Sequence, residues 1–170
     1  MEAINQLERS YFLLKSGGGD YRECIEWALD RLRRDEEDDD TDIALLAASH
    51  TPVEALTIAE VVIERYSGYQ ALDAQLAAGK YLVALRHDYL RGIETVQTLE
   101  PKLRALCERL RFPAWLRVLC RNCRYANEAS DHRDLFDKEF AYLARLWAVA
   151  TSRLQFESRY KGVISSRHDL

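Results

Sequence analysis

Apolar residues recur every three or four positions along most of the chain, and this spacing restricts the fold more than any other feature. It is the period of one face of an α-helix, whereas a half-buried strand would alternate apolar and polar residues. We find no alternating segment of that kind, and the 170 residues include only 7 Gly and 3 Pro. Both observations favour helices. We therefore predict an all-α fold of about seven or eight helices, in a compact bundle or in stacked antiparallel hairpins.

Helix-start signals accompany the apolar spacing in the first half of the chain. Thr51, Pro52 and Glu54 provide a capping residue, a Pro in the first turn and an acid three residues after the cap. Asp20 and Glu23 have the same capping spacing. We predict helices over residues 2–15, 20–34, 42–49 and 52–66.

Gly and Pro divide the second half of the chain into further helices. The helical pattern over residues 69–91 contains Gly79, where we expect a kink or a split. Pro101 and Pro113 are expected to open the next two helices, because Pro is favoured in the first helical turn. The polar stretch 122–133 is expected to contain a loop.

The last strong helical pattern starts near Asp134 and predicts one side of the core. Its apolar residues share one face: Phe136, Phe140, Leu143, Trp147, Ala150 and Leu154. The length suits one domain, so we predict a single α-helical domain over residues 1–156 and a polar C-terminal tail over residues 157–170.

The sequence also predicts where the protein works. No apolar run approaches the roughly 18 residues that span a bilayer, and the first residues do not form a basic region followed by an apolar block. Four cysteines lie in ordinary helical patterns, which suits a reducing compartment. We therefore expect a cytoplasmic protein without contact with a membrane.

An acidic segment carries seven carboxylates in eight residues: Asp35, Glu36, Glu37, Asp38, Asp39, Asp40 and Asp42. Oxygen-rich loops bind divalent cations, but this one lacks the Gly and the final Glu of the EF-hand pattern. A solvated, self-repelling loop is a second interpretation. The third is that the segment, with nearby Glu54, attracts a basic protein by long-range electrostatics.

A basic segment follows in the second half, where residues 102–124 hold seven basic side chains and one acid. Arg117, Arg121 and Arg124 form a stripe beside the apolar face of their helix. Such a stripe suits contact with phosphate. It is also a possible internal partner for the acidic segment. Residues 1–85 carry a net charge of −9 and residues 86–170 a net charge of +5.

Candidate catalytic and metal-binding residues are few. Cys120 and Cys123 have CxxC spacing, but a zinc site would need further ligands from Cys107, His87 or His132. Both thiols fall on the expected core face, so we predict two packed cysteines and no structural zinc. The sequence contains no metalloprotease, serine-hydrolase, phosphate-loop or dinucleotide-binding motif. We expect no cofactor and no enzymatic activity.

These observations favour a small acidic protein-binding module whose electronegative surface engages a basic partner. Being small, acidic and without catalytic motifs, the chain resembles in general type the immunity and antitoxin proteins of bacteria. One alternative is a nucleic-acid-associated accessory protein that uses the Arg-rich segment. A second alternative is an enzyme whose active site follows no known motif.

Overall fold

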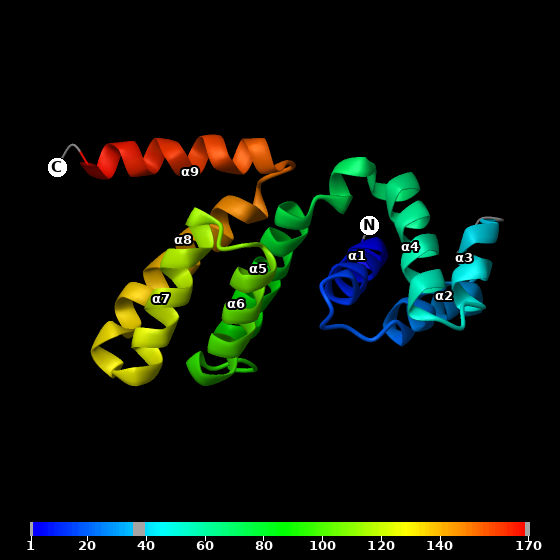
Figure 1. Ribbon diagram of the computed structural model, residues 1–170, viewed down its shortest axis with the longest axis horizontal. Helices are drawn as coiled ribbons and strands as arrows, with labels where there is room; N and C mark the ends of the chain where they lie inside the picture. The colour runs from blue at the N-terminus through cyan, green and yellow to red at the C-terminus, as the bar shows by residue number, and fades with distance from the viewer. Residues whose placement is uncertain (1, 36–39, 169–170) are drawn as a thin grey trace. The chain divides into compact units, whose positions relative to one another are not determined.

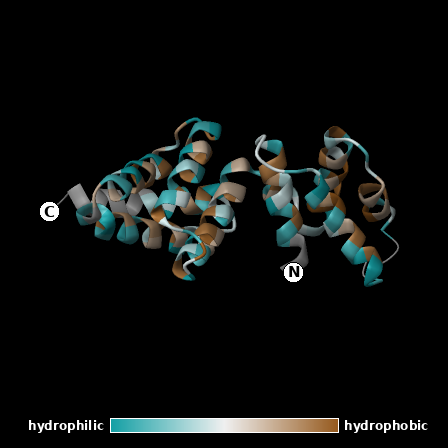
Figure 2. Ribbon diagram, turned by 90° about the horizontal axis from the view of Figure 1, so that it is seen from below, coloured by the Kyte–Doolittle hydropathy of each residue, from teal (hydrophilic) through white to brown (hydrophobic). Residues whose placement is uncertain are grey.

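The computed structural model describes residues 2–35 and 40–168 (Figure 1). Within these residues the chain forms nine α-helices and two short 3₁₀ helices, with no strand, which confirms the predicted all-α fold. No helix in this part of the chain is long and apolar enough to cross a bilayer. Figure 2 shows hydrophobic and hydrophilic residues side by side on the same helices, as expected when each helix buries one face.

The helices lie in this order: α1 Glu2–Lys15, α2 Arg22–Arg33, α3 Thr41–Ala47, α4 Pro52–Ser67, η1 Tyr69–Leu72, α5 Ala74–Leu90, α6 Val96–Arg109, α7 Ala114–Glu128, η2 Ser130–His132, α8 Arg133–Ala148 and α9 Arg153–His168. The chain divides into two compact units, the N-terminal unit (residues 1–77) and the C-terminal unit (residues 78–170). The N-terminal unit has 17 acidic and 7 basic residues, a net charge of −10. The C-terminal unit has 11 acidic and 17 basic residues, a net charge of +6.

In the N-terminal unit, α1 packs against α2 and α4, and α3 packs against α2 and α4. Two fully buried alanines on α4, Ala55 and Ala59, leave room for the neighbouring helices to approach closely. The buried core comprises Leu7, Tyr11, Cys24, Trp27, Ala28, Ile43, Leu46, Ala55, Ala59, Val62, Ile63 and Ala71.

In the C-terminal unit, α7 packs against both α6 and α8, and α9 packs against α8. The predicted core face of α8 is confirmed for Phe136, Phe140, Leu143 and Trp147, all of which are buried. The Trp147 ring stacks on Phe156 of α9 with 3.8 Å between centroids, and Trp115 of α7 meets Trp147 edge-on. Aromatic rings therefore join three helices at this end of the unit.

Capping boxes fix where α4 and α6 begin, whereas α2 begins at Arg22 without one: its N-cap is Tyr21, and the Glu23 carboxylate accepts a hydrogen bond from Ser10 at 3.1 Å. The predicted capping box of Thr51 and Glu54 at the start of α4 is confirmed. A second capping box, between Thr95 and Thr98, starts α6 at Val96, five residues before the predicted start. Pro101 therefore lies inside α6 and does not open it. Its cost there is one lost backbone hydrogen bond and crowding of its ring against the carbonyl four residues earlier, and the buried face of the helix offsets this cost.

The predicted split at Gly79 does not occur, because α5 continues from Ala74 to Leu90 through this residue. The break instead falls at Asp73, whose carboxylate accepts hydrogen bonds from the backbone N–H groups of Gln75 and Leu76 at 2.9 and 2.8 Å. A Cβ on Gly79 would lie 2.1 Å from a ring carbon of Trp147. The glycine is thus explained by close packing and not by a helix break.

The last predicted helix is in fact two helices, since α8 ends at Ala148 and α9 begins at Arg153. Leu154 is 76% exposed and does not belong to the core face, whereas Phe156 is fully buried. Helix α9 continues through residues 157–168, most of the range predicted to be a polar tail. The loop expected within residues 122–133 is confined to the short stretch after α7, which contains η2.

Candidate functional site

The acidic segment is only partly described. Residues 36–39, which include Glu36, Glu37, Asp38 and Asp39, lie outside the described residues. Asp35 is exposed and has a left-handed backbone, with φ of 56°. Asp40 and Asp42 are at the start of α3, where the chain turns back toward α4.

The Asp40 carboxylate accepts hydrogen bonds from three residues. It is the N-cap of α3, and its carboxylate accepts a hydrogen bond from the backbone N–H of Asp42 at 3.0 Å. The same carboxylate accepts hydrogen bonds from Arg65 at 2.5 Å and from the Tyr66 hydroxyl at 2.9 Å. Only 6% of its side chain is exposed. Arg65 also forms an ion pair with Asp42, so one guanidinium on α4 holds two carboxylates of the acidic segment.

These contacts determine the charge state of the cluster. Burial by itself would raise the pKa of Asp40, but the hydrogen bonds from Arg65, Tyr66 and the N–H of Asp42 outweigh it and lower the pKa. The same carboxylates raise the pKa of Arg65. Asp40 is therefore ionised, and the single charge of Arg65 offsets one of the two carboxylate charges. The ion pairs attach this end of the acidic segment to α4.

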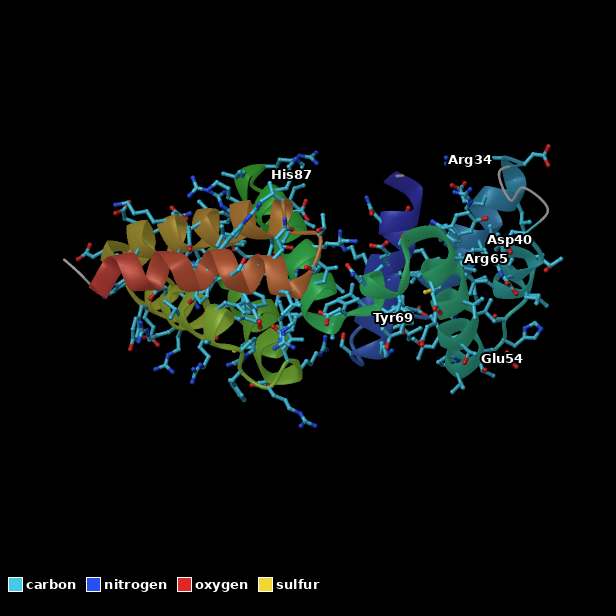
Figure 3. The ribbon with its side chains drawn as sticks, turned by 90° about the horizontal axis from the view of Figure 1, so that it is seen from above. Arg34, Asp40, Glu54, Arg65, Tyr69 and His87 are labelled. Carbon is cyan, nitrogen blue, oxygen red and sulfur yellow. The ribbon has the colours of Figure 1, made fainter. Side chains whose placement is uncertain are left out.

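Glu54 is exposed, and the structure does not place it with Asp40. It lies eleven positions before Arg65, about 16 Å along the axis of α4; Figure 3 shows Arg65 beside Asp40 and Glu54 apart from both. The Glu54 carboxylate accepts hydrogen bonds from the backbone N–H groups of His50 and Thr51 at 3.0 and 3.2 Å, and these lower its pKa. Its charge is fixed in place at the start of the helix.

The outward face of α4 combines exposed apolar and acidic side chains. Val53 and Val61 are 72% and 43% exposed, eight positions apart on the same side of the helix. Thr57 lies between them, Glu54 is next to Val53, and Glu64 lies one turn after Val61; all three are exposed. We call these five residues the α4 face. Among the outward residues of this helix, only Glu54 was predicted from the sequence as a binding residue, because of its charge, and the two valines were missed.

The predicted basic stripe is present on α7. Arg117, Arg121 and Arg124 are all exposed. Arg124 forms an ion pair with Glu128 one turn later at 3.1 Å. Since the stripe belongs to the C-terminal unit and the acidic segment to the N-terminal unit, internal pairing between them stays a prediction.

The cysteines are packed thiols without reactive character. Cys123 is fully buried, and the Cys120 thiol lies 3.2 Å from the Leu103 carbonyl oxygen. Burial raises the pKa of Cys123 to about 12 and also raises that of Cys120. Within residues 2–35 and 40–168, no three His, Cys, Asp or Glu residues gather as a metal site would require.

Two polar clusters join helices and are possible starting points for acid–base chemistry. The Tyr11 hydroxyl donates to Glu60 at 2.5 Å and accepts from Lys15 at 2.6 Å, joining α1 to α4. Burial and the bond to Glu60 raise the pKa of Tyr11, which makes it a poor general base. In the C-terminal unit, Tyr89 donates to Asp137 at 2.8 Å and its pKa is likewise raised by burial. Both clusters have structural roles in holding helices together.

Comparison with known proteins gives no further indication of function. No family model, no curated protein and no solved structure matches this chain.

Proposed function

We propose that the N-terminal unit is a protein-binding module and that its α4 face docks a partner with a basic surface. The observation that carries the proposal is the exposure of Val53 and Val61 on a side of α4 that also carries the exposed carboxylates of Glu54 and Glu64. Specific interfaces typically have an apolar centre and a polar rim. An acidic rim selects a partner whose own rim is basic.

The charge of the whole unit supports the same partner class. A net charge of −10 on 77 residues attracts basic proteins over a distance of about 10 Å at moderate salt. Because Arg65 pairs with both Asp40 and Asp42 and offsets one of their two charges, these two residues serve the fold in this proposal. The other carboxylates of the acidic segment contribute to attraction before contact.

The proposal has a more specific form, in which the partner is a toxic protein and the chain acts as an immunity or antitoxin protein. Such a role requires a cytoplasmic location for an intracellular target, and the four free cysteines suit a reducing compartment. Co-expression of the chain with its partner would then restore growth.

The test begins with a partner isolated from the native cell on the immobilised chain, followed by stopped-flow association with purified components. Glu64→Gln should slow association and reduce its salt dependence, as rim charges do. Its matched control is Glu26→Gln, which removes the same charge from an exposed position on α2. Equal effects of the two variants would show that only the overall charge of the unit matters.

The apolar centre needs a separate variant. Val61→Ser should speed dissociation, because it removes apolar area from the centre of the interface. Val149→Ser, at a 55% exposed position in the C-terminal unit, is the matched control and should leave dissociation unchanged. An unaltered dissociation rate for Val61→Ser would refute docking on the α4 face.

A further inference from the structure

Helix α7 presents a basic outward face that the proposed function does not use. Arg117, Arg121, Arg124 and Tyr125 follow a spacing of four, three and one residues, which places them on one side of the helix. We call these four residues the α7 face. The other side of the helix is buried through Trp115, Leu116, Leu119 and Cys123, so the orientation of the helix is fixed by the core.

The arginines on this face are largely without internal partners. Within the described part of the chain, Arg117 and Arg121 form no ion pair, and both are exposed. Arg124 is paired with Glu128, but both side chains are more than half exposed, and such pairs are worth little. The unit has a net charge of +6. The α7 face can therefore accept an anionic ligand without first breaking a strong internal interaction.

Exposed aromatic rings accompany these charges. Tyr125 is 40% exposed and lies one turn from Arg121. At the other end of α7, the turn from α6 holds Phe112 56% exposed, and both Arg111 and Phe112 have a φ of 58°. The N–H of Phe112 donates to the Cys107 carbonyl at 2.8 Å, which fixes the turn. A phenylalanine is thus kept in an unfavourable backbone conformation with much of its ring in solvent.

We propose that the α7 face, together with Phe112, binds single-stranded nucleic acid. Arginines neutralise backbone phosphates, and aromatic rings stack on unpaired bases, which is how proteins bind single strands without sequence preference. Paired bases in a duplex would not reach the rings, and an acidic peptide or an anionic membrane would use the arginines alone. This surface lies in the C-terminal unit and is independent of the α4 face.

The test measures fluorescence anisotropy of labelled oligo(dT) and oligo(U), about 15 nucleotides long, with the full chain at several salt concentrations. We expect a dissociation constant between about 10⁻⁶ and 10⁻⁴ M that weakens as salt rises. Polyglutamate is the competitor that carries charge without bases. Absence of binding at protein concentrations up to about 10⁻⁴ M in low salt, or equal binding of polyglutamate, would overturn the proposal.

Four variants separate charge from stacking, each checked for folding by circular dichroism. Arg117→Ser/Arg121→Ser should reduce the slope of log affinity against log salt by about 1.4. The control Arg91→Ser/Arg145→Ser removes the same charge from exposed positions outside α7. It should keep most of the wild-type slope of log affinity against log salt. Tyr125→Leu and Phe112→Leu keep the apolar bulk and should each weaken binding about tenfold. If both Leu variants bind as tightly as the wild type, the surface is a general polyanion site and the proposal fails.

Discussion

Replacement of Gly79 by Ala tests the closest packing contact in the C-terminal unit. In an isolated helix this change stabilises by about 1 kcal/mol, because Gly is a poor helix former. Here the new Cβ would lie 2.1 Å from Cδ2 and 2.3 Å from Cε3 of Trp147. Favourable contact between carbon atoms requires about 3.5–4.0 Å, so either the ring or helix α5 must move.

The Trp147 ring has little room to move. It is 2% exposed, stacks on Phe156 and touches Trp115 edge-on at 5.2 Å between centroids. Overpacking in a filled core costs about 1–3 kcal/mol and occasionally more, and a contact this short belongs at the upper end. Subtracting the helix-propensity gain leaves a net loss of about 2 kcal/mol in the free energy of unfolding.

Urea unfolding followed by far-ultraviolet circular dichroism measures this loss. Ala141→Gly, at an exposed position on α8, provides the helix-propensity reference within the same unit. In a Trp147→Leu background, Gly79→Ala should become neutral or stabilising by up to about 1 kcal/mol, because the obstructing ring is gone. If Gly79→Ala stabilises the wild-type protein, α5 and α8 do not approach as closely as the structure shows, and the explanation of this glycine is wrong.

Three further predictions follow from the core, the ion pair and the thiols. Trp147→Ala should lower the free energy of unfolding by about 3–5 kcal/mol in the same urea assay, and a shift near zero would show that the residue is not buried. The pKa of Asp40 is lower when folded than when unfolded, so its stabilising effect is present above the unfolded value and lost as pH falls through the folded value. As pH is lowered, the free energy of unfolding should therefore fall less steeply in Asp40→Asn than in the wild type. An unchanged dependence on pH would contradict the ion pair with Arg65. Cys24 and Cys123 are buried with pKa values raised to about 12, so a thiol reagent near pH 8 should label them only after unfolding; rapid labelling of the native chain would contradict this.

Helical periodicity was sufficient to predict the fold class, but not every helix boundary. The start of α4 was predicted because Thr51 and Glu54 form the common version of the capping box. The start of α6 was missed because Thr98 takes the place of the usual Glu or Gln in an equivalent box. Pro101 then gave a misleading signal, since a proline several residues into a helix costs less than the capping and burial around it contribute.

The role of Gly79 could not be predicted because its cause is distant in sequence. A glycine within a helical pattern indicates either a break or a close approach of another element, and local sequence does not distinguish the two. The element that approaches here is Trp147, 68 positions later. Only the packing of α5 against α8 shows which explanation applies.

The acidic segment illustrates the same limit for the candidate site. In the sequence its seven carboxylates form one uniform group, and nothing local separates them. In the structure, Asp40 and Asp42 differ from a free surface carboxylate because both pair with Arg65, which lies 25 and 23 positions later in the sequence. A count of charges therefore overstated the exposed negative charge at this end of the segment. The two valines of the α4 face could not be predicted as exposed, because α4 has apolar residues on several sides and its sequence does not show which of them face solvent.

The distribution of charge between the two units keeps the tests of the two proposed surfaces separate. The N-terminal unit carries −10 and the C-terminal unit +6, so each attracts ligands that the other repels. A change of charge on the α4 face therefore tests protein binding, and a change of charge on the α7 face tests binding of nucleic acid.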